Sequence, residues 1–418
     1  MKNIVNELQK RGFLDAMTGE EIRDLVENPI TLYLGFDPTS DSLHLGNLVG
    51  IIALAWFQKY GHEPIALVGG ATGLIGDPSG KSHERNLLDN DALEKNVQGI
   101  RRSLEAILRQ EVTVLNNYEW FSKLRYLDFL RDVGKHFRLG TMLAKESVKT
   151  RLALEEGISY TEFSYQLLQA YDFLHLYDTH NVQLQLGGSD QWGNITAGTE
   201  LVRKMRGESV YGLTWPLITR SDGKKFGKSE EGAIWLNPDK VSPYDFYQYL
   251  FRIPDADVSK LLRMLTFLDL EEIEEIEEEM KGSRYVANTA QKRLAEEVTR
   301  IVHGEAGVEE ALRITKAAKP GSETSLDLAT LESLSKEVPS LTLPAQSVVG
   351  ARFIDLIVHS GLLPSKGEAR RMILNGGAYL NNKKVTDENL LVVEELLIEN
   401  RFLLLGIGKK KKMVLQIA

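Results

Sequence analysis

The chain has 418 residues, of which 43% are hydrophobic and 26% are charged; its formal net charge is −9, and it contains no cysteine. This length suits about two or three domains with large cores, and the missing cysteines exclude disulfides, thiolate catalysis and cysteine-type zinc sites. Because no apolar run reaches membrane-spanning length and the N-terminus is charged throughout, we expect a cytoplasmic protein without a membrane partner.

Charge is distributed unevenly along the chain. Residues 347–418 carry 11 Lys and Arg against 7 Asp and Glu, a net of +4, which leaves −13 on the preceding residues. A basic module on an acidic body indicates that the tail meets a polyanion. A solvated tail kept soluble by its lysines is the alternative.

The stretch 37–47 lies between an apolar run, residues 31–36, and an amphipathic segment, residues 48–57. This order predicts a strand, a loop and a helix. His44 and Gly46 then lie on the first turn of the helix, where unpaired backbone N–H groups favour an anion such as phosphate. Before this stretch, the spacing of apolar residues predicts an N-terminal helical segment.

A second strand is predicted at residues 65–69, and it runs into a glycine-rich turn, residues 70–81. Strands separated by a helix form a parallel sheet, whose ligands bind at the carboxyl ends of the strands. Asp77 lies in this turn, where its carboxylate can hold an ammonium group. A plain Asp-Pro turn is the alternative.

The segment 159–176 is the most informative predicted helix. Tyr165, Gln169 and Asp172, at i, i+4 and i+7, form one polar stripe along an otherwise apolar helix. The stripe either faces water or lines a pocket for a small zwitterion with a polar tip.

Two later loops follow the same logic. A predicted strand, residues 182–186, ends in paired glycines and Asp190, a backbone on which a nucleoside can lie and a carboxylate for ribose hydroxyls. Asp190 as a helix N-cap is the alternative. Farther on, Lys225 and Lys228 flank a glycine, and a flexible basic loop can close over a triphosphate. Most lysine-rich loops have no such role.

The C-terminal half begins with a predicted helical region whose outer face is rich in glutamate. Residues 320–346, rich in Ser, Thr and Pro, are predicted to be a linker with one short helix. In the final module, Ser365 and Glu368 form a capping box, and Lys366 and Arg370 share one helix face.

These motifs together resemble a known family. Residues 44–47 and 225–229 resemble the HIGH and KMSKS signatures of the class I aminoacyl-tRNA synthetases, in the same order. Residues 31–33, 67–81, 162–173 and 187–196 resemble the bacterial tyrosyl-tRNA synthetases, and the resemblance covers essentially the whole chain. Asn47 replaces the second histidine of HIGH, and Phe226-Gly227 replaces the Met-Ser pair of KMSKS.

The resemblance implies an α/β fold: a Rossmann-like parallel-sheet catalytic domain, then a helical domain and a small C-terminal α+β RNA-binding domain like that of ribosomal small-subunit protein four. The expected boundaries are residues 1–220 for the catalytic domain, 221–319 for the KMSKS-type loop and helical domain, 320–346 for the linker and 347–418 for the RNA-binding domain.

The resemblance also implies roles for individual residues. The positions expected to bind tyrosine are Tyr33, Asp77, Tyr165, Gln169, Asp172 and Gln191. Those expected to bind ATP are Gly35, Asp37, His44, Gly46, Asn47, Gly188, Asp190 and Lys228. Those expected to act on the phosphates during catalysis are Thr39, His44, Lys81, Arg85, Lys225, Lys228 and Ser229. Those expected to bind RNA are Lys366, Arg370 and Arg371.

The implied reaction joins tyrosine to tRNA. ATP, accompanied by Mg²⁺ and without a protein-bound metal, activates L-tyrosine to tyrosyl-adenylate, and the tyrosyl group then passes to the terminal ribose of tRNA(Tyr). The resemblance further implies a homodimer, with Arg203, Lys204 and Arg206 contacting tRNA. Residues 126–137 have a mixed apolar and basic face, which suits docking on a second subunit. A tryptophanyl-tRNA synthetase and a catalytically idle RNA-binding protein are the alternatives.

Overall fold

The computed structural model describes residues 3–79, 89–108, 112–155, 157–221, 223, 226–229, 232–317, 319, 321–322, 326–408 and 411–418. The chain forms two compact units: residues 1–241 with 249–302, and residues 242–248 with 303–418. Each unit is described by itself. Within the described residues, no helix is both long and apolar enough to cross a membrane.

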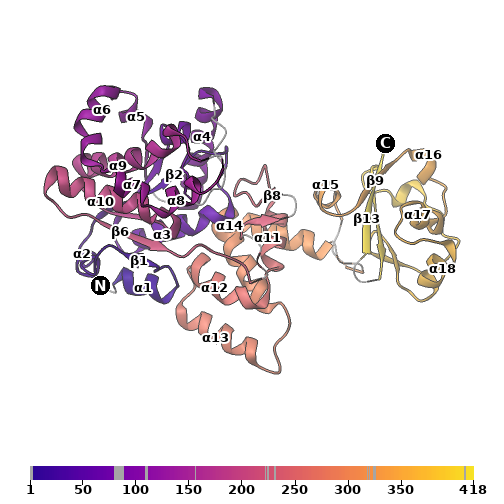
Figure 1. Cartoon of the computed structure of the whole chain (residues 1–418). Helices are drawn as coiled ribbons and strands as arrows, with labels where there is room; N and C mark the ends of the chain where they lie inside the picture. Colours follow the sequence, from indigo (N-terminus) through magenta and orange to yellow (C-terminus); the bar gives the residue numbers. More distant parts are fainter. Residues whose placement is uncertain are drawn as a thin grey trace. The chain divides into compact units, whose positions relative to one another are not determined.

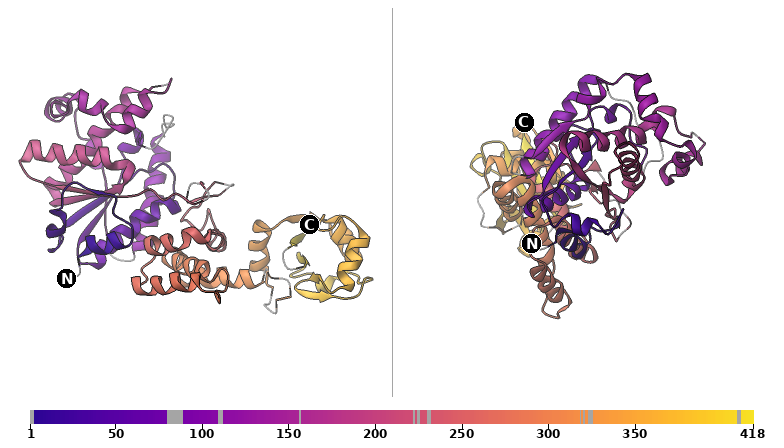
Figure 2. Two further views of the ribbon diagram at one scale, coloured as in Figure 1. Left: turned by 60° about the horizontal axis from the view of Figure 1, so that its bottom comes forward. Right: turned by 90° about the vertical axis from the view of Figure 1, so that its left-hand side faces the viewer.

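The first unit is built around a twisted sheet, which can be followed in Figures 1 and 2. Its strands are β1 (Ala16–Met17), β2 (Thr31–Phe36), β3 (Glu63–Val68), β4 (Thr113–Asn116), β5 (Val182–Gly188) and β6 (Tyr211–Trp215). They lie in the order β1-β6-β5-β2-β3-β4, and every neighbouring pair is parallel except β1 with β6. The expected Rossmann-like parallel sheet is confirmed.

The helices of the first unit are α1 (Ile4–Lys10), α2 (Ile22–Leu25), α3 (Leu45–Lys59), α4 (Asn90–Leu108), α5 (Tyr118–Phe121), α6 (Tyr126–Asp132), α7 (Leu139–Leu143), α8 (Glu146–Leu152), α9 (Tyr160–His180), α10 (Trp192–Arg206), α12 (Asp255–Leu265) and α13 (Leu270–Lys281). Short 3₁₀ turns are η1 (Thr72–Leu74), η2 (Gly134–His136) and η3 (Ser189–Gln191), and a small hairpin joins β7 (Lys228–Ser229) to β8 (Gly232–Ala233). Helices α11 (Pro243–Phe251) and α14 (Thr289–Ala317) belong partly to each unit.

Successive residues of β2 point to opposite faces of the sheet, because side chains alternate along a strand. Tyr33 is buried in an apolar cluster with Phe173 of α9 and Leu201 of α10. Leu34 packs on the other face, where a Cβ added to Gly50 of α3 would lie 2.6 Å from Leu34 Cδ2. The sheet is therefore covered on both faces, as the continuous apolar strands require.

The strand order reverses beside β2. The chain moves from β2 through α3 to β3 in one direction, and from β5 through α10 to β6 in the other. Ligands of such sheets bind in the crevice at the carboxyl ends of the strands on either side of this point. The loops after β2, β3 and β5 therefore define the candidate site.

The second unit holds a sheet of β9 (Ser340–Leu343), β10 (Ala378–Leu380), β11 (Lys383–Val385), β12 (Phe402–Ile407) and β13 (Lys411–Ile417), in the order β11-β10-β12-β13-β9. Its helices are α15 (Leu328–Glu337), α16 (Ala345–Val348), α17 (Phe353–His359) and α18 (Lys366–Leu374), followed by the 3₁₀ turn η4 (Glu394–Leu396). Figure 1 shows α15 on one side of this sheet and α17 and α18 on the other.

Both faces of the second sheet are packed. Phe353 of α17 and Leu403 of β12 belong to the larger core, whereas Phe402 and Leu404 of β12 pack with Leu331 of α15 in another. The capping box predicted for α18 is confirmed on one side, because the Glu368 N–H donates to Ser365 Oγ at 3.3 Å.

Two local predictions were incomplete. The N-terminal stretch is not wholly helical, since β1 leaves it to pair with β6. The stretch 320–346 holds α15, β9 and the start of α16, and β9 pairs in parallel with β13. Both strands were missed because each gains its hydrogen bonds from a partner far along the chain. The domain boundaries expected after residues 220, 319 and 346 stay predictions.

Candidate active site

The polar stripe of α9 faces inward. Asp172 and Tyr165 are 2% and 5% exposed, so the alternative in which the stripe faces water is wrong. The stripe lies beneath the loops at the carboxyl ends of the strands, where it meets side chains from both halves of the sheet.

Asp172 is a buried carboxylate that accepts hydrogen bonds from neutral donors. Asn117 Nδ2 donates to Asp172 Oδ2 at 3.1 Å, and Trp120 Nε1 donates to Oδ1 at 2.9 Å. Burial raises the pKa of Asp172 well above its ordinary value, and these two hydrogen bonds oppose the shift only in part.

The Tyr33 hydroxyl lies in the same buried region. The side chain is 1% exposed, and its oxygen has no hydrogen-bond partner among the described residues. Burial, followed by the charge of Asp172, raises the pKa of Tyr33 well above its ordinary value. A buried hydroxyl without a partner costs free energy unless a ligand supplies one.

A second buried carboxylate, Asp77, is surrounded by amides. Gln191 Nε2 donates to Asp77 Oδ2 at 2.7 Å, and Asn194 Nδ2 lies 3.4 Å from Oδ1. Gln169 Nε2 in turn donates to Gln191 Oε1 at 3.3 Å. The Asp-Pro turn forms, because the Ser79 N–H donates to Asp77 Oδ1 at 2.9 Å. The role of Asp77 in holding an ammonium group stays a prediction.

A third carboxylate joins the two halves of the site. Asp37 follows β2 and accepts from the Tyr165 hydroxyl at 2.8 Å and from the Thr72 hydroxyl at 2.9 Å. Asn117 Nδ2 also donates to Thr72 Oγ1 at 3.0 Å, so a chain of hydrogen bonds runs from Asp172 to Tyr165. Asp37 and Tyr165, expected at different ligand groups, are thus direct partners.

Thr72, Asn117, Trp120 and Asn194 belong to this network and were missed by the sequence analysis. Asn117 directly follows β4, so a polar residue at the carboxyl edge of the sheet was the available signal. For Trp120 no such signal existed, because its contact with Asp172 depends on how α5 packs against α9.

The N-terminus of α3 differs from expectation. His44 precedes the helix as its cap, and its N–H donates to Asn47 Oδ1 at 3.1 Å. The Leu45 N–H donates to the carbonyl of Ile234 at 2.7 Å. The expectation of a first turn with unpaired amides is therefore wrong for Leu45, because a distant segment already uses that donor.

The remaining predicted positions are placed as follows. Gly35 is exposed at the end of β2, with no atom within 4 Å of a Cβ built on it. A Cβ on Gly188 would lie 2.7 Å from Asp190 Oδ1. Asp190 lies inside η3, and Gln191 precedes α10, so the N-cap interpretation of Asp190 is wrong. Thr39 and Lys228 are exposed.

Three predicted phosphate-binding residues, Lys81, Arg85 and Lys225, lie outside the described residues, and only the backbone of Ser229 is described. Among the described residues, no group of three or more His, Asp or Glu could hold a metal ion.

The three cationic side chains of α18 differ in their ion-pair partners. Lys366 Nζ lies 2.8 Å from Asp355 Oδ1, and Arg370 Nε lies 2.5 Å from Glu388 Oε2. Arg371 is exposed. All three lie in the second unit, apart from the carboxylate network.

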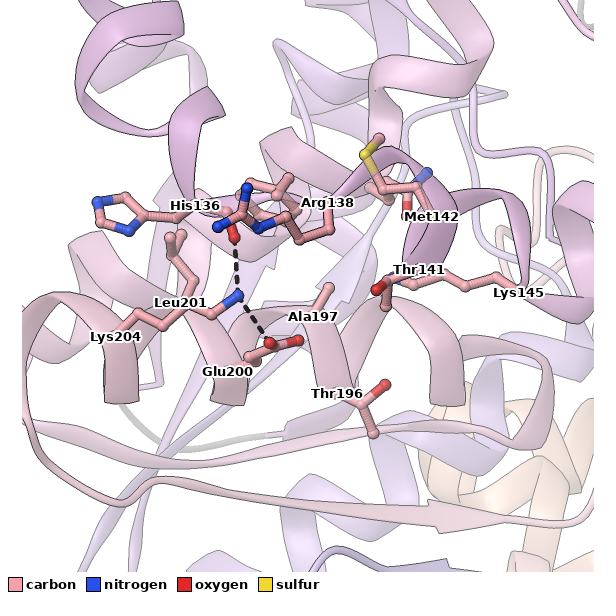
Figure 3. A pocket seen from close by; sticks show the side chains of 12 residues that line it. His136, Arg138, Thr141, Met142, Lys145, Thr196, Ala197, Glu200, Leu201 and Lys204 are labelled. Carbon is pink, nitrogen blue, oxygen red and sulfur yellow. Dashed lines mark hydrogen bonds and ion pairs between the residues drawn. The ribbon is translucent and has the colours of Figure 1, made fainter.

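A small, open pocket lies in the first unit beside α10 (Figure 3). Arg138, Lys145, Gln166, Thr196, Glu200 and Lys204 contribute to its lining. Lys204 Nζ lies 2.7 Å from Glu200 Oε1 and donates to the His136 carbonyl at 2.7 Å. Burial lowers the pKa of Lys145 to about 8, and the charge of Glu200 opposes this shift.

Comparison with known proteins agrees with this geometry. A family model described as tRNA synthetases class I (W and Y) matches residues 25–318, and one described as the tyrosine–tRNA ligase SYY-like C-terminal domain matches residues 330–415. A tyrosine–tRNA ligase of Protochlamydia amoebophila is 56% identical over 100% of this chain and 99% of its own. The chain belongs to the tyrosine–tRNA ligase family.

Other members of the tyrosine–tRNA ligase family are similarly close. The chloroplastic/mitochondrial tyrosine–tRNA ligase of Arabidopsis thaliana is 53% identical over 100% of this chain and 84% of its own. A C-terminally truncated mitochondrial tyrosyl-tRNA synthetase from Aspergillus nidulans superposes with a TM-score of 0.66 and is 32% identical, covering 74% of this chain and 92% of the solved one.

The raised pKa of Asp172 predicts how stability depends on pH. The folded state binds the Asp172 proton more tightly than the unfolded state, whose pKa is near 3.8. The contribution of the protonated carboxyl is complete below that value and is lost as the pH rises through the raised pKa. Urea unfolding from about pH 4.5 to about pH 8 should therefore show wild type losing free energy of unfolding relative to Asp172→Asn.

Asp132 provides the control. It is exposed, and its hydrogen bond with Arg131 lowers its pKa, so its titration lies below this pH range. The difference between wild type and Asp132→Asn should be constant there. A difference that is also constant for Asp172→Asn would contradict a raised pKa.

Proposed function

We propose that the chain activates L-tyrosine with ATP and transfers the tyrosyl group to tRNA(Tyr). The observation that carries this proposal is a buried Tyr33 hydroxyl, without a hydrogen-bond partner among the described residues, in the same buried region as the carboxyl of Asp172. A phenol can donate to Asp172 and accept from Tyr33 at once, whereas phenylalanine leaves both groups without a ligand partner, at about 1–3 kcal/mol for each.

The other end of the same pocket suits an ammonium group. Within the described residues, the hydrogen-bond partners of Asp77 are neutral donors, and none of them supplies a counter-charge. In the proposal, Asp77, Tyr165 and Gln169 surround the ammonium of tyrosine, and Gln191 lies near its carboxylate. A cation from the ligand then replaces the missing counter-charge.

ATP is proposed to lie along the carboxyl ends of β2 and β5. The open space beside Gly35 leaves room for a nucleoside. Gly188 lies directly against Asp190, whose carboxylate is the proposed partner of the ribose hydroxyls. Asp37, His44, Gly46 and Asn47 complete the proposed nucleotide site. Magnesium arrives bound to ATP and neutralises part of the triphosphate charge.

The proposed chemistry needs no protein nucleophile. The tyrosine carboxylate attacks the α-phosphorus in line, the bond to the bridging oxygen breaks, and pyrophosphate leaves; the terminal ribose hydroxyl of tRNA then attacks the tyrosyl carbonyl and AMP leaves. The chain contributes positioning and charge stabilisation, for which Lys228 is the described cation and Thr39, Lys81, Arg85, Lys225 and Ser229 are the further candidates.

Tryptophan fits this pocket less well. The indole N–H can donate to Asp172, but it cannot accept a hydrogen bond from the buried Tyr33 hydroxyl. An idle RNA-binding protein would have no use for the buried carboxylates Asp77 and Asp172, each of which costs stability. We therefore favour a tyrosine-specific ligase over both alternatives.

For tRNA we propose two contact regions. The first is the exposed basic face of α18, with Lys366, Arg370 and Arg371, which suits an RNA backbone. The second is the cation-lined pocket of Figure 3, where Lys145 and Lys204 could meet a phosphate. Arg206 already pairs with Asp178 at 2.6 Å.

The proposed location is the cytoplasm, where tRNA is charged.

We also propose a homodimer. Leu127, Leu139, Tyr126 and Tyr160 are 76%, 62%, 61% and 65% exposed, and the hydroxyls of the two tyrosines lie 3.3 Å apart. Large apolar side chains gathered on α6, α7 and the start of α9 are typical of a surface covered by another protein. A second copy of the chain is the occupant we propose.

The ligase proposal is tested by ATP–pyrophosphate exchange. Wild type should exchange with tyrosine and far less with phenylalanine or tryptophan. Lys228→Ala should lower the exchange rate about 10²- to 10³-fold while tyrosine binding changes little, because the lost cation acts on charge in the transition state. Lys281→Ala, an exposed lysine on α13, is the control. Exchange with tryptophan alone would refute the proposal.

The RNA-binding proposal predicts a separation of the two steps. Removing residues 347–418 should spare adenylate formation and impair tRNA charging. In the full chain, Lys366→Ala/Arg370→Ala/Arg371→Ala should keep the exchange rate and weaken tRNA binding. The slope of the logarithm of the tRNA-binding constant against the logarithm of the salt concentration should become shallower by about one for each lost phosphate contact. Normal charging by both variants would contradict a role of this module in tRNA recognition.

The dimer proposal is tested by sedimentation at micromolar concentration. Leu127→Asp should convert the dimer to a monomer, since it places a charge on the apolar surface. Val286→Asp is the matched control, because Val286 is 72% exposed but lies between α13 and α14. A wild-type chain that sediments as a monomer would contradict the proposal.

A further inference from the structure

The loop that carries Lys228 is joined to the start of α3 by backbone hydrogen bonds. The Ile234 N–H donates to the Gly227 carbonyl at 2.9 Å, and the Leu45 N–H donates to the Ile234 carbonyl at 2.7 Å. The Leu236 N–H donates to the Leu43 carbonyl at 2.9 Å. The base of the loop is thereby aligned with the residues that precede and begin α3.

Gly227 lies close to the start of α3. Its φ of +77° is left-handed, and a Cβ added to it would lie 3.0 Å from the Gly46 nitrogen. Only glycine meets both requirements without strain. The position of Gly227 therefore fixes how closely the loop approaches α3, and Lys228 is the next residue along the chain.

Tyr249 of α11 holds Gly227 in this position. Its hydroxyl accepts a hydrogen bond from the Gly227 N–H at 2.9 Å. Its ring meets the buried Phe226 edge-on, with centroids 6.3 Å apart, and the Arg220 guanidinium lies 6.0 Å from the same ring. One side chain thus contacts three residues of the segment that leads into the loop.

We propose that Tyr249 is a positioning residue for the loop: it latches Gly227 to α11 and so returns Lys228 to the N-terminus of α3. Helix α11 supplies a rigid support, because Tyr247 and Leu250 on it are buried. The hydroxyl contributes a single neutral hydrogen bond, whose loss frees the loop without removing the aromatic packing. The catalytic consequence rests on the function proposed above, whereas the latch itself does not.

Tyr249→Phe tests the proposal, because it deletes only the hydroxyl. The first readout is the rate of limited tryptic cleavage after Lys228 in the folded full-length protein, identified by mass spectrometry. Loss of one such hydrogen bond should raise this rate about two- to tenfold, since cleavage follows the population of the released loop. This readout requires no substrate.

The second readout is tyrosine-dependent ATP–pyrophosphate exchange. We expect kcat to fall about two- to tenfold, while KM for tyrosine stays unchanged. Tyr285→Phe is the matched control, because the Tyr285 hydroxyl also accepts from a backbone amide, that of Ala290 at 3.0 Å, but lies outside the loop. It should change neither readout.

The outcomes separate the two proposals. Cleavage of Tyr249→Phe at the wild-type rate would overturn the latch. Faster cleavage with unchanged or higher kcat would show that the latch does not position Lys228 for catalysis. A wild-type chain without tyrosine-dependent exchange would refute the proposed function, and the cleavage rates would still decide the latch.

Discussion

The structure of the site depends on burying carboxylates among neutral hydrogen-bond donors. Asp172 and Asp77 are buried, and their partners among the described residues are amide, indole and backbone N–H donors. Neutral donors lower the cost of burying charge without cancelling it. The proposed ligand, which brings both a cation and a hydroxyl, would supply partners that these buried groups lack among the described residues.

At the N-terminus of α3, two backbone amides already have hydrogen-bond acceptors within the chain. A free helix N-terminus attracts anions, yet here the Leu45 amide is already bonded to Ile234 and the His44 amide to Asn47. The two signature segments of the family are thus parts of one hydrogen-bonded structure. The position of the segment around Gly227 therefore decides which backbone N–H groups at the start of α3 can bind an anion.

In the second unit, the basic C-terminal module packs against helices that precede it in the sequence. Leu331 and Leu334 of α15, Phe402 and Leu404 of β12, and Ile314 of α14 share one apolar cluster. Asn382, in the turn between β10 and β11, donates from its buried side chain to the carbonyl of Ala317 at 2.6 Å. The C-terminal module is therefore packed on the end of α14, in part through residues that composition alone marked as a linker.

The sequence by itself determined the features that depend on neighbours along the chain. These are the strand, loop and helix around residue 40, the polar stripe of α9, the cap of α18 and the order of the two signatures. Only the tertiary structure decided which side chains meet. Asn117 and Trp120 reach Asp172 across 55 and 52 residues, and Tyr165 reaches Asp37 across 128. Periodicity and capping are local, so they can be read from spacing, whereas a buried carboxylate takes whichever donors the packing of distant elements brings within hydrogen-bond distance.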